Sequence, residues 1–310
     1  MSGVFPFPYG AGALVPGTLL NGRYKVIREL GKGGMGEIFV GRDTLLGRDV
    51  AVKVQTARTF ESTDDFAYYG DRMHQECERM RDVLEIQGIP RVFDEGQFGR
   101  SGRRFMVMEL VEGITLAEWI DEHEPVPVAA AASVLAQLCE ILGRLHGKGY
   151  VHCDVTPRNV MIQFDGCVRL LDVGISTEVG EANTEPGGSP RYAPPEQYVS
   201  NAVLTSQVDV FSLGALLFQM LAGELPYAGV EYPFDGTEQA FPRGLRARIP
   251  DELRSLGLAM VSFDPQERPR AADELPGYLR PMLPAFGSAA SPKATEPDPT
   301  AYYRRGLWRS

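Results

Sequence analysis

The sequence predicts an α+β fold in which a small antiparallel β-sheet with one main helix precedes a larger, mostly helical part. Three observations support this prediction. Short β-branched runs separated by Gly-rich or Asp/Gly turns occupy residues 24–54, an amphipathic helical stripe follows over residues 71–86, and helical patterns dominate after Gly113. With 310 residues, of which 44% are hydrophobic, the chain has enough apolar material for such a core.

The first part, residues 23–111, contains the strand candidates YKVIREL, EIFVGRD and VAVKV, followed later by RVFDEGQF and RRFMVMELV. Between the two groups, Met73, Cys77, Met80 and Leu84 lie on one helical stripe at spacings of three and four. Residues 1–22 are rich in Gly, Pro and small residues, so we expect them to form a flexible leader.

The second part, residues 112–283, contains helical patterns over residues 115–123 and 128–149, and MIQFDGCVRLLDVG predicts two strands around an Asp-Gly turn. The apolar run over residues 208–222 contains Asp209 and is shorter than the roughly 20 residues that span a bilayer, so we expect a buried core helix and no membrane segment. Residues 284–310, rich in Pro, Ala, Ser and Thr, are expected to be a disordered tail. The alternative is that its YYRRGLW motif docks on the fold.

Composition excludes several classes of function. A formal net charge of −10 disfavours nucleic-acid binding, because phosphate backbones attract clustered Lys and Arg. The four cysteines form no Cys-x-x-Cys pair, which argues against a zinc site or a disulfide framework and favours a reducing, cytoplasmic setting. The sequence carries no signal for an oligomeric state.

Two features of the first part suggest phosphate binding. GKGGMGEIF lies between two strand candidates, and its glycines allow backbone N–H groups to approach phosphate oxygens closely. VAVKV then places Lys53 in an apolar strand, where its ammonium group either reaches out to solvent or binds a phosphate and a carboxylate. Glu76 is the first candidate for that carboxylate and Glu78 the second, because helix phase alone does not separate them.

The acidic candidates of the second part lie in VHCDVTPRNVMI and LLDVG. Asp154 precedes Asn159 by five residues, and Asp172 follows after the predicted hairpin. Their oxygen atoms suit Mg²⁺ bound to phosphates, with one Asp left to orient a hydroxyl nucleophile. Any one of these residues alone is more typical of a turn cap. The ordered combination is more specific.

The ordered motifs GKGGMG, AVK, a helical Glu, HCD with a following Asn, DVG, GGSPRYAPPE, DVFSLG and DPQERP resemble the protein kinase superfamily. The similarity extends over most of the chain and is greatest to bacterial serine/threonine kinases of eukaryotic (Hanks) type. It implies a bilobal kinase fold, with residues 23–111 as the N-lobe and residues 112–283 as the C-lobe. It also implies ATP and Mg²⁺, or Mn²⁺ in its place, as cofactors and a protein as substrate.

The resemblance assigns roles to individual residues. Asp154 is expected to accept the substrate hydroxyl, Asn159 and Asp172 to hold the metal, and Lys53 to pair with the α/β-phosphates and Glu76. Residues expected to contact the nucleotide are Gly31, Lys32, Gly33, Gly34, Gly36, Ile38, Ala51, Lys53, Met108, Glu109 and Val111. Structural roles are implied for His152 in the core, for a Glu196–Arg268 ion pair, and for Asp209 as an anchor of the catalytic loop.

The chain departs from the family pattern at three positions. Cys153 replaces the Arg that normally meets a phosphorylated activation loop, so we expect less dependence on that phosphorylation. Thr156 replaces the Lys that touches the γ-phosphate, and we hypothesise that Arg158 supplies the missing charge, as in many tyrosine kinases. Val173 replaces a Phe, which thins a hydrophobic contact.

The predicted function is therefore that of an ATP-dependent protein serine/threonine kinase. Ser189 supports this hydroxyl specificity, because it stands where such kinases place a Thr beside the catalytic Asp. The alternative is a pseudokinase scaffold that binds nucleotide with little or no transfer, which Cys153, Thr156 and Val173 favour. Retention of Lys53 and Asp154, together with both candidate metal ligands, argues against it.

Overall fold

The computed structural model describes residues 14–32, 36–55, 63–99, 102–173, 176–225, 227 and 249–307, except for the side chains of residues 32 and 63–65. The chain divides into two compact units. Unit 1 comprises Met1–Leu84 and Pro90–Val111, and unit 2 comprises Glu85–Ile89 and Glu112–Ser310. The main boundary lies between Val111 and Glu112, close to Gly113, after which helical patterns dominate the sequence.

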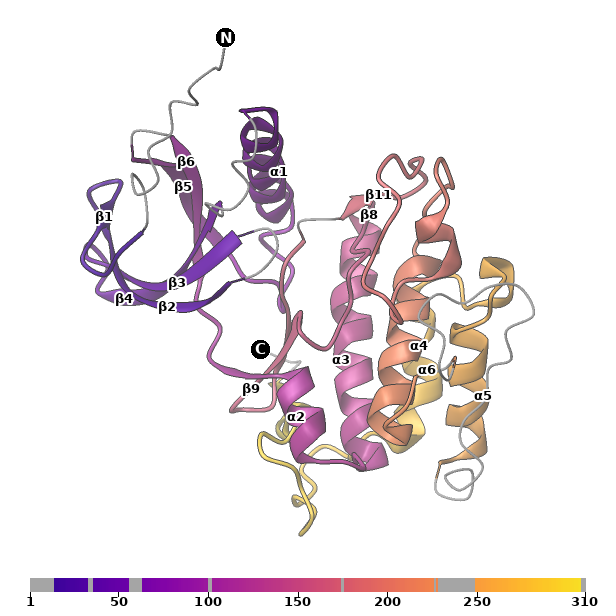
Figure 1. The fold of residues 1–310 in the computed structure, drawn as a ribbon. Coiled ribbons are helices and arrows are strands. Elements are labelled where there is room, and N and C mark those ends of the chain that lie inside the picture. Colours follow the sequence, from indigo (N-terminus) through magenta and orange to yellow (C-terminus); the bar gives the residue numbers. More distant parts are fainter. Residues whose placement is uncertain are drawn as a thin grey trace. The chain divides into compact units, whose positions relative to one another are not determined.

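Unit 1 is built on a six-stranded antiparallel sheet in the order β1-β2-β3-β4-β6-β5 (Figure 1). Its one long helix, α1 (Thr63–Asp82), packs against β4, β5 and β6. This arrangement confirms the predicted sheet with one main helix. The strands are β1 (Leu19–Leu20), β2 (Tyr24–Lys32), β3 (Gly36–Asp43), β4 (Arg48–Gln55), β5 (Val92–Phe98) and β6 (Arg103–Glu109).

Part of the expected leader belongs to this sheet. β1 pairs with β2, and both Leu14 and Leu20 are buried in the same apolar cluster as Val52 and Phe105. The expectation of a flexible leader is therefore wrong for residues 14–22, because these leucines complete the core on one face of the sheet. Residues 1–13 lie outside the described residues.

The apolar stripe of α1 is confirmed at Met73, Cys77 and Met80, which are at most 5% exposed. Leu84 does not belong to it, because α1 ends two residues earlier and the chain no longer follows helical spacing. Leu84 is exposed, and Val83 is buried instead.

Unit 2 is mostly helical, with α3 (Val128–Gly147) and α4 (Gln207–Ala222) packed side by side (Figure 1). Its described part contains two small antiparallel sheets, β10-β9-β7 and β11-β8. The other elements are β7 (Gly113–Thr115), α2 (Leu116–Glu122), β8 (Tyr150–Val151), β9 (Val160–Gln163), β10 (Val168–Leu170), β11 (Thr177–Glu178), η2 (Pro195–Tyr198), α5 (Asp251–Met260), η4 (Pro265–Glu267), η5 (Ala272–Glu274), α6 (Pro276–Leu279), η6 (Arg280–Met282) and α7 (Ala301–Arg305).

Two apolar helices form the centre of unit 2. Helix α4 is buried along most of its length, which confirms the core helix expected for residues 208–222. Among the described helices, α3 alone has the length and apolarity of a membrane span, and 72% of its most apolar window is buried inside the fold. Burial of this kind is typical of a core helix.

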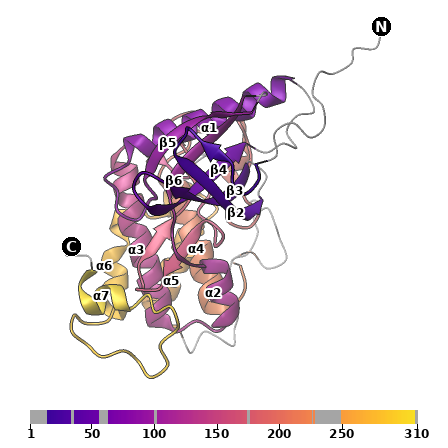
Figure 2. The same ribbon diagram turned by 90° about the vertical axis from the view of Figure 1, so that its left-hand side faces the viewer.

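The C-terminal tail is ordered, and the expectation of disorder is wrong for residues 284–307. The Trp119 indole Nε1 donates to the Pro297 carbonyl at 2.9 Å. Tyr302 and Tyr303 both donate to the Glu140 carboxylate on α3, each at 3.0 Å. Figure 2 shows this yellow segment lying along unit 2. The docking alternative is the correct one.

The prediction of disorder from composition failed because hydrogen bonds and close backbone packing hold the tail. A Cβ at Gly166 would meet the Asp298 carbonyl oxygen at 2.3 Å, so the tail backbone approaches the β9–β10 turn too closely for any larger residue. Gln137 of α3 also donates to the Pro299 carbonyl at 3.3 Å. None of these contacts produces a periodic apolar pattern in the sequence.

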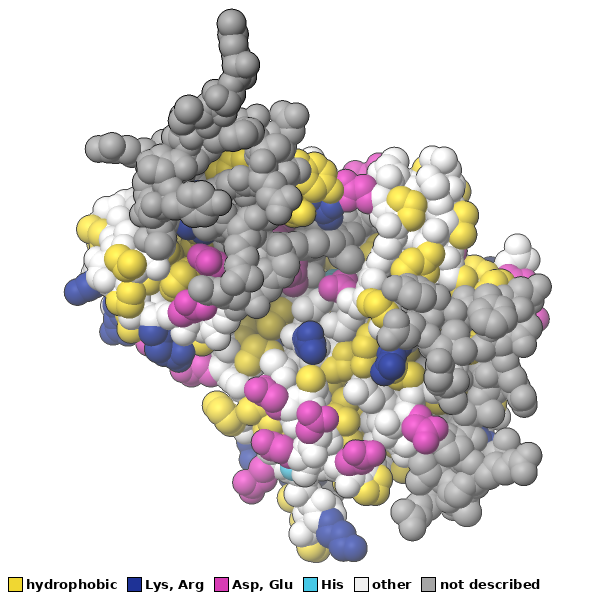
Figure 3. Space-filling view, in the orientation of Figure 1, with side chains coloured by type: hydrophobic (Ala, Val, Ile, Leu, Met, Phe, Trp, Pro, Cys, Tyr) yellow, Lys and Arg dark blue, Asp and Glu magenta, His cyan; other side chains and the backbone are white. Residues whose placement is uncertain are grey.

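The face of unit 2 around α2 is acidic (Figure 3). Glu118, Asp121 and Glu122 of α2 are exposed, and Figure 3 shows acidic side chains gathered over this helix. This distribution agrees with the net negative charge of the chain.

Candidate active site

Lys53 and Glu76 form a buried ion pair within unit 1. The Lys53 Nζ lies 2.7 Å from Glu76 Oε1 and 2.8 Å from Oε2, and each of the two side chains is only 5% exposed. Pairing is what allows an ammonium and a carboxylate to remain charged there. Glu78 instead pairs with Arg81 at the surface. The choice left open by helix phase is therefore settled in favour of Glu76.

Lys53 shares one face of the sheet with other residues expected to contact the nucleotide. The strand register pairs Lys53 with Ile38 and pairs Ala51 with Met108. Because directly paired residues project to the same side of a sheet and side chains alternate along a strand, these four lie on one face. The valines between them, such as Val52, project into the apolar core on the opposite face.

The glycine-rich hairpin is described only at its two sides. Gly31 is the next-to-last residue of β2 and pairs with Ile38, and Gly36 begins β3. A Cβ at Gly36 would meet the Val54 carbonyl oxygen at 2.7 Å, so the close approach of β3 to β4 requires glycine there. Gly33, Gly34 and the Lys32 side chain lie outside the described residues, and their expected phosphate contacts remain predictions.

The segment expected to face adenine follows β6. The Glu109 backbone N–H donates to the Arg91 carbonyl at 2.8 Å, so this donor is already used inside unit 1. Val111 is 9% exposed and is the last residue of unit 1. The expected contribution of Glu109 is therefore narrowed to its carbonyl oxygen.

Asp154 is the centre of the polar cluster in unit 2. Its Oδ1 accepts from the Ser189 hydroxyl at 2.5 Å, and its Oδ2 accepts from the Asn159 Nδ2 at 2.7 Å. The same Nδ2 also donates to the Asp154 carbonyl at 3.0 Å. These bonds fix the carboxylate from two sides, and a fixed carboxylate beside a serine hydroxyl can act as a general base towards a hydroxyl.

Asp209 anchors the catalytic loop, which is the segment of residues 152–159 that carries Asp154. Its Oδ2 accepts from the His152 amide at 2.8 Å and its Oδ1 from the Cys153 amide at 2.9 Å. The His146 Nε2 also lies 2.8 Å from Oδ2. Burial raises the pKa of the Asp209 carboxyl, but these hydrogen bonds and the neighbouring histidines outweigh burial and hold the pKa below its ordinary value. The expected anchoring role of this buried charge is confirmed.

Asn159 and Asp172 offer oxygen atoms of the kind that Mg²⁺ prefers. The Leu171 amide donates to the Asn159 carbonyl at 2.7 Å, which brings the backbone preceding Asp172 next to Asn159. Both bonds to Asp154 use the Asn159 Nδ2, so the amide oxygen Oδ1 takes no part in them. Asp172 has a φ of 56°, an uncommon conformation for a residue other than glycine and one often found at functional sites. This donor set fits a hard divalent cation.

A second group of possible metal ligands lies in unit 1. His74, Glu78 and Glu95 bring their ligand atoms within 4.8 Å of one another. Both carboxylates are already paired with Arg81, and the group lies at the surface. It therefore carries no argument for a metal.

Thr156 and Arg158 occupy different environments. Thr156 is 6% exposed, so its side chain is buried in unit 2. Arg158 is exposed and makes no hydrogen bond or ion pair with any residue that the structure describes. Its guanidinium is therefore available to an anionic ligand, as the hypothesis of a displaced cation requires.

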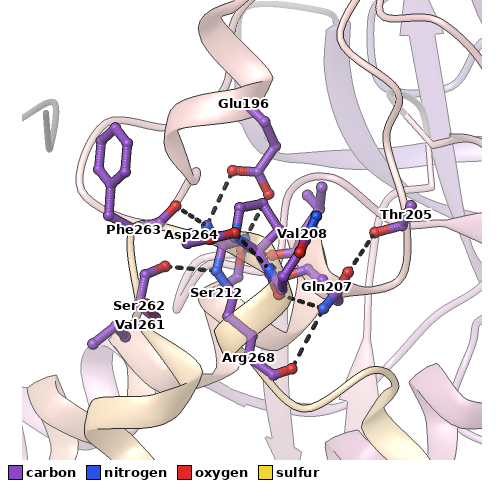
Figure 4. Close-up of polar contacts among 12 residues, drawn as sticks. Glu196, Thr205, Gln207, Val208, Ser212, Val261, Ser262, Phe263, Asp264 and Arg268 are labelled. Carbon is purple, nitrogen blue, oxygen red and sulfur yellow. Dashed lines mark hydrogen bonds and ion pairs between the residues drawn. The ribbon is translucent and has the colours of Figure 1, made fainter. Parts of the chain in front are cut away.

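The activation segment, residues 172–196, ends at an ion pair between the fully buried Arg268 and Glu196, which is 15% exposed (Figure 4). Arg268 Nη1 lies 2.5 Å from Glu196 Oε1, and Nη2 lies 3.1 Å from Oε2. The Arg268 side chain is fully buried, and it also donates to the carbonyls of Ser262, Phe263 and Gln207. The predicted Glu196–Arg268 pair is confirmed as a bidentate contact.

Two residues of this region were not anticipated. His146 lies in the last turn of α3 and contacts Asp209, and the available signal was a histidine at the end of an apolar helix just before the catalytic loop. Gln197 follows the APPE motif and contacts the catalytic loop. A single Gln next to a motif provides no periodic signal, and only the fold shows its partners.

Residues 24–276 match the protein kinase domain family, in agreement with the fold and the site. The chain therefore belongs to that family. The chain is 34% identical over 309 residues to the serine/threonine-protein kinase pkn2 of Myxococcus xanthus, an alignment covering 92% of this chain and 36% of the relative. It is 32% identical over 309 residues to PknL of Mycobacterium bovis, covering 93% and 73%. Over 269 residues it is 29% identical to a probable serine/threonine-protein kinase PknB of Lactococcus lactis, covering 84% and 42%. The chain thus spans less than half the length of two of these relatives.

Proposed function

We propose that this chain is a protein serine/threonine kinase that transfers the γ-phosphate of ATP to Ser or Thr hydroxyls of protein substrates. The observation that carries the proposal is the Asp154 carboxylate, held between the Asn159 amide and the Ser189 hydroxyl. Membership of the protein kinase family and similarity to proteins named serine/threonine kinases support it.

Asp154 supplies the base. A substrate hydroxyl that replaces or joins the Ser189 hydroxyl at this carboxylate can pass its proton to an oxygen that already accepts a hydroxyl hydrogen bond. Ser189 also supports specificity for Ser and Thr, because it stands beside the base where such kinases place a Thr. The base and the residue beside it therefore belong to one pre-organised cluster.

Asn159 and Asp172 are the residues that would hold Mg²⁺ or Mn²⁺, and the metal would supply neutralisation of phosphate charge. Lys53, kept charged and oriented by Glu76, would bind phosphate oxygens. Ile38, Ala51 and Met108 would provide the apolar surface for the adenine ring. Arg158 would supply the cation that Thr156 lacks.

We also propose a cytoplasmic location for the protein. The described cysteines are all free, and Cys77, Cys139 and Cys153 are buried. Burial raises the pKa of Cys77 to about 12, which keeps this thiol protonated and unreactive. Free thiols that need no disulfide partner are consistent with the cytoplasmic localisation that we propose.

The experiment that tests this function uses purified chain, γ-labelled ATP, Mg²⁺ or Mn²⁺, and casein or myelin basic protein as generic substrates. We expect labelled protein with the native chain and none with Asp154→Asn. Nucleotide binding, measured by calorimetry, is expected to persist in Asp154→Asn. Binding without transfer by the native chain would instead identify a scaffold and overturn the proposal.

A further inference from the structure

Gln197 lies in η2, directly after the activation segment, and is 2% exposed. Its neighbour Glu196 is fixed by the ion pair to Arg268, so the backbone that carries Gln197 is itself anchored. The Gln197 side chain points towards the catalytic loop, where it contacts Cys153.

The Gln197 side chain connects two segments. Its Nε2 donates to the Cys153 carbonyl at 2.9 Å and to the Gly187 carbonyl at 3.3 Å. Carbonyl oxygens only accept hydrogen bonds, so the side-chain atom between them must be the NH₂ group. One amide group therefore ties the catalytic loop, through Cys153, to the activation segment, through Gly187.

The Gln197 backbone reinforces the same connection. Its carbonyl accepts from the Gly187 amide at 2.8 Å and from the Asn183 Nδ2 at 2.7 Å. Asn183 is 7% exposed and belongs to the activation segment. Gly187 thus both donates to and accepts from Gln197. The activation segment is held to Gln197 at two residues, Asn183 and Gly187.

These contacts bear directly on the catalytic base. Cys153 has a φ of 65°, a left-handed conformation that is strained for a residue other than glycine and persists only where the surroundings enforce it. Asp209 holds its amide N–H, and Gln197 holds its carbonyl. The next residue is Asp154, so the two hydrogen bonds fix the backbone from which the base projects.

Every group in this connection is neutral. The contacts of Gln197 with Cys153, Gly187 and Asn183 join amide groups to carbonyl oxygens and involve no charged side chain. They hold the activation segment against a catalytic loop that carries Cys153 where kinases commonly carry a phosphate-binding Arg. We propose that Gln197 is a positioning residue that orders the activation segment without a phosphate, so that the chain is active in its unphosphorylated form.

This inference rests on the proposed kinase function, and its test separates the two. The chain is treated with a broad-specificity protein phosphatase, its unphosphorylated mass is confirmed, and initial transfer of label to casein or myelin basic protein is measured after the phosphatase is removed. The variants are Gln197→Leu, and Gln137→Leu as a matched control. Gln137 is also a buried glutamine that donates to two carbonyls, those of Gly166 and Pro299, away from the activation segment.

We expect the unphosphorylated native chain to keep its initial rate within about twofold of the untreated chain. Gln197→Leu is expected to lower kcat at least tenfold with little change in the KM for ATP. Gln137→Leu is expected to leave kcat within about twofold once the folded fraction is matched. Hydrogen exchange at residues 183–189 is expected to accelerate in Gln197→Leu alone, which gives a readout that does not depend on activity.

Two results would overturn the inference. One is loss of activity of the native chain on dephosphorylation that rephosphorylation restores. The other is a Gln197→Leu variant that matches Gln137→Leu in both kcat and hydrogen exchange. A native chain that transfers no phosphate in any state would contradict the proposed function, while the exchange measurement would still decide whether Gln197 orders the segment.

Discussion

The Glu196–Arg268 ion pair at the end of the activation segment gives a quantitative prediction about stability. Replacing Glu196 leaves the fully buried Arg268 without its counter-charge, and replacing Arg268 leaves a Glu196 carboxylate that is only 15% exposed. Removing one partner of a buried pair typically costs about 3–5 kcal/mol. Glu196→Ala is expected near the lower end, because Arg268 keeps its hydrogen bonds to the carbonyls of Ser262, Phe263 and Gln207. Arg268→Leu is expected near the upper end, because it also leaves those three carbonyl oxygens without their donor.

The two variants are therefore expected to differ in a defined order. At about 2–4 °C per kcal/mol, the value for a domain the size of unit 2, Glu196→Ala lowers Tm by about 6–12 °C and Arg268→Leu by about 10–20 °C. Differential scanning calorimetry and urea unfolding measure both values. The double variant is expected to lose much less than the sum of the single losses, since the second change removes a group that is already unpaired.

The reasoning would be refuted if both single variants fell within 1 kcal/mol of the native chain, or if the double variant lost the sum of the two. Either result would mean that the pair is not the desolvated, bidentate contact seen in Figure 4. A larger loss for Glu196→Ala than for Arg268→Leu would contradict the stated role of the three carbonyls. Circular dichroism of each variant at low temperature checks that it is folded before heating.

Three further predictions concern other parts of the chain. Arg158→Ala is expected to lower phosphoryl transfer by about 10²–10³-fold with Arg158→Lys partly active, and an unchanged rate would remove the displaced-cation hypothesis. Tyr303→Phe is expected to lower the unfolding free energy by about 1–3 kcal/mol in urea titration by removing the hydrogen bond to Glu140, with no loss if the tail does not dock. The hydrogen bond from Arg23 lowers the pKa of Asp43 from 3.8 to about 2, so its stabilising effect is present above pH 4 and is lost as the pH falls towards 2. Acid titration followed by circular dichroism is expected to show a shallower loss of stability over that range for Asp43→Asn than for the native chain.

Much of the fold could be predicted because its elements produce local patterns. The strands of unit 1 contain short runs rich in β-branched residues, such as VAVKV in β4, and α4 is apolar for most of its length. The Glu196–Arg268 pair and the anchoring role of Asp209 followed from the order of motifs and were confirmed by the hydrogen bonds that these side chains make.

Other features could not be predicted because they depend on contacts between distant residues. The tail docks through hydroxyl and carbonyl groups against Glu140 and Trp119, more than 150 positions earlier in the chain, and composition carries no trace of such contacts. The partner of Lys53 was ambiguous between Glu76 and Glu78 until the phase of α1 was known. The Gln197 contacts likewise depend on the path of the activation segment, which no sequence period encodes.

The most direct test of the central claim is the identity of the phosphorylated residue. Mass spectrometry of casein or myelin basic protein treated with the chain, ATP and Mg²⁺ is expected to find phosphoserine and phosphothreonine that are absent when Asp154→Asn is used. Phosphotyrosine as the main product, or equal phosphorylation by the native chain and Asp154→Asn, would contradict a serine/threonine kinase that uses Asp154 as its base.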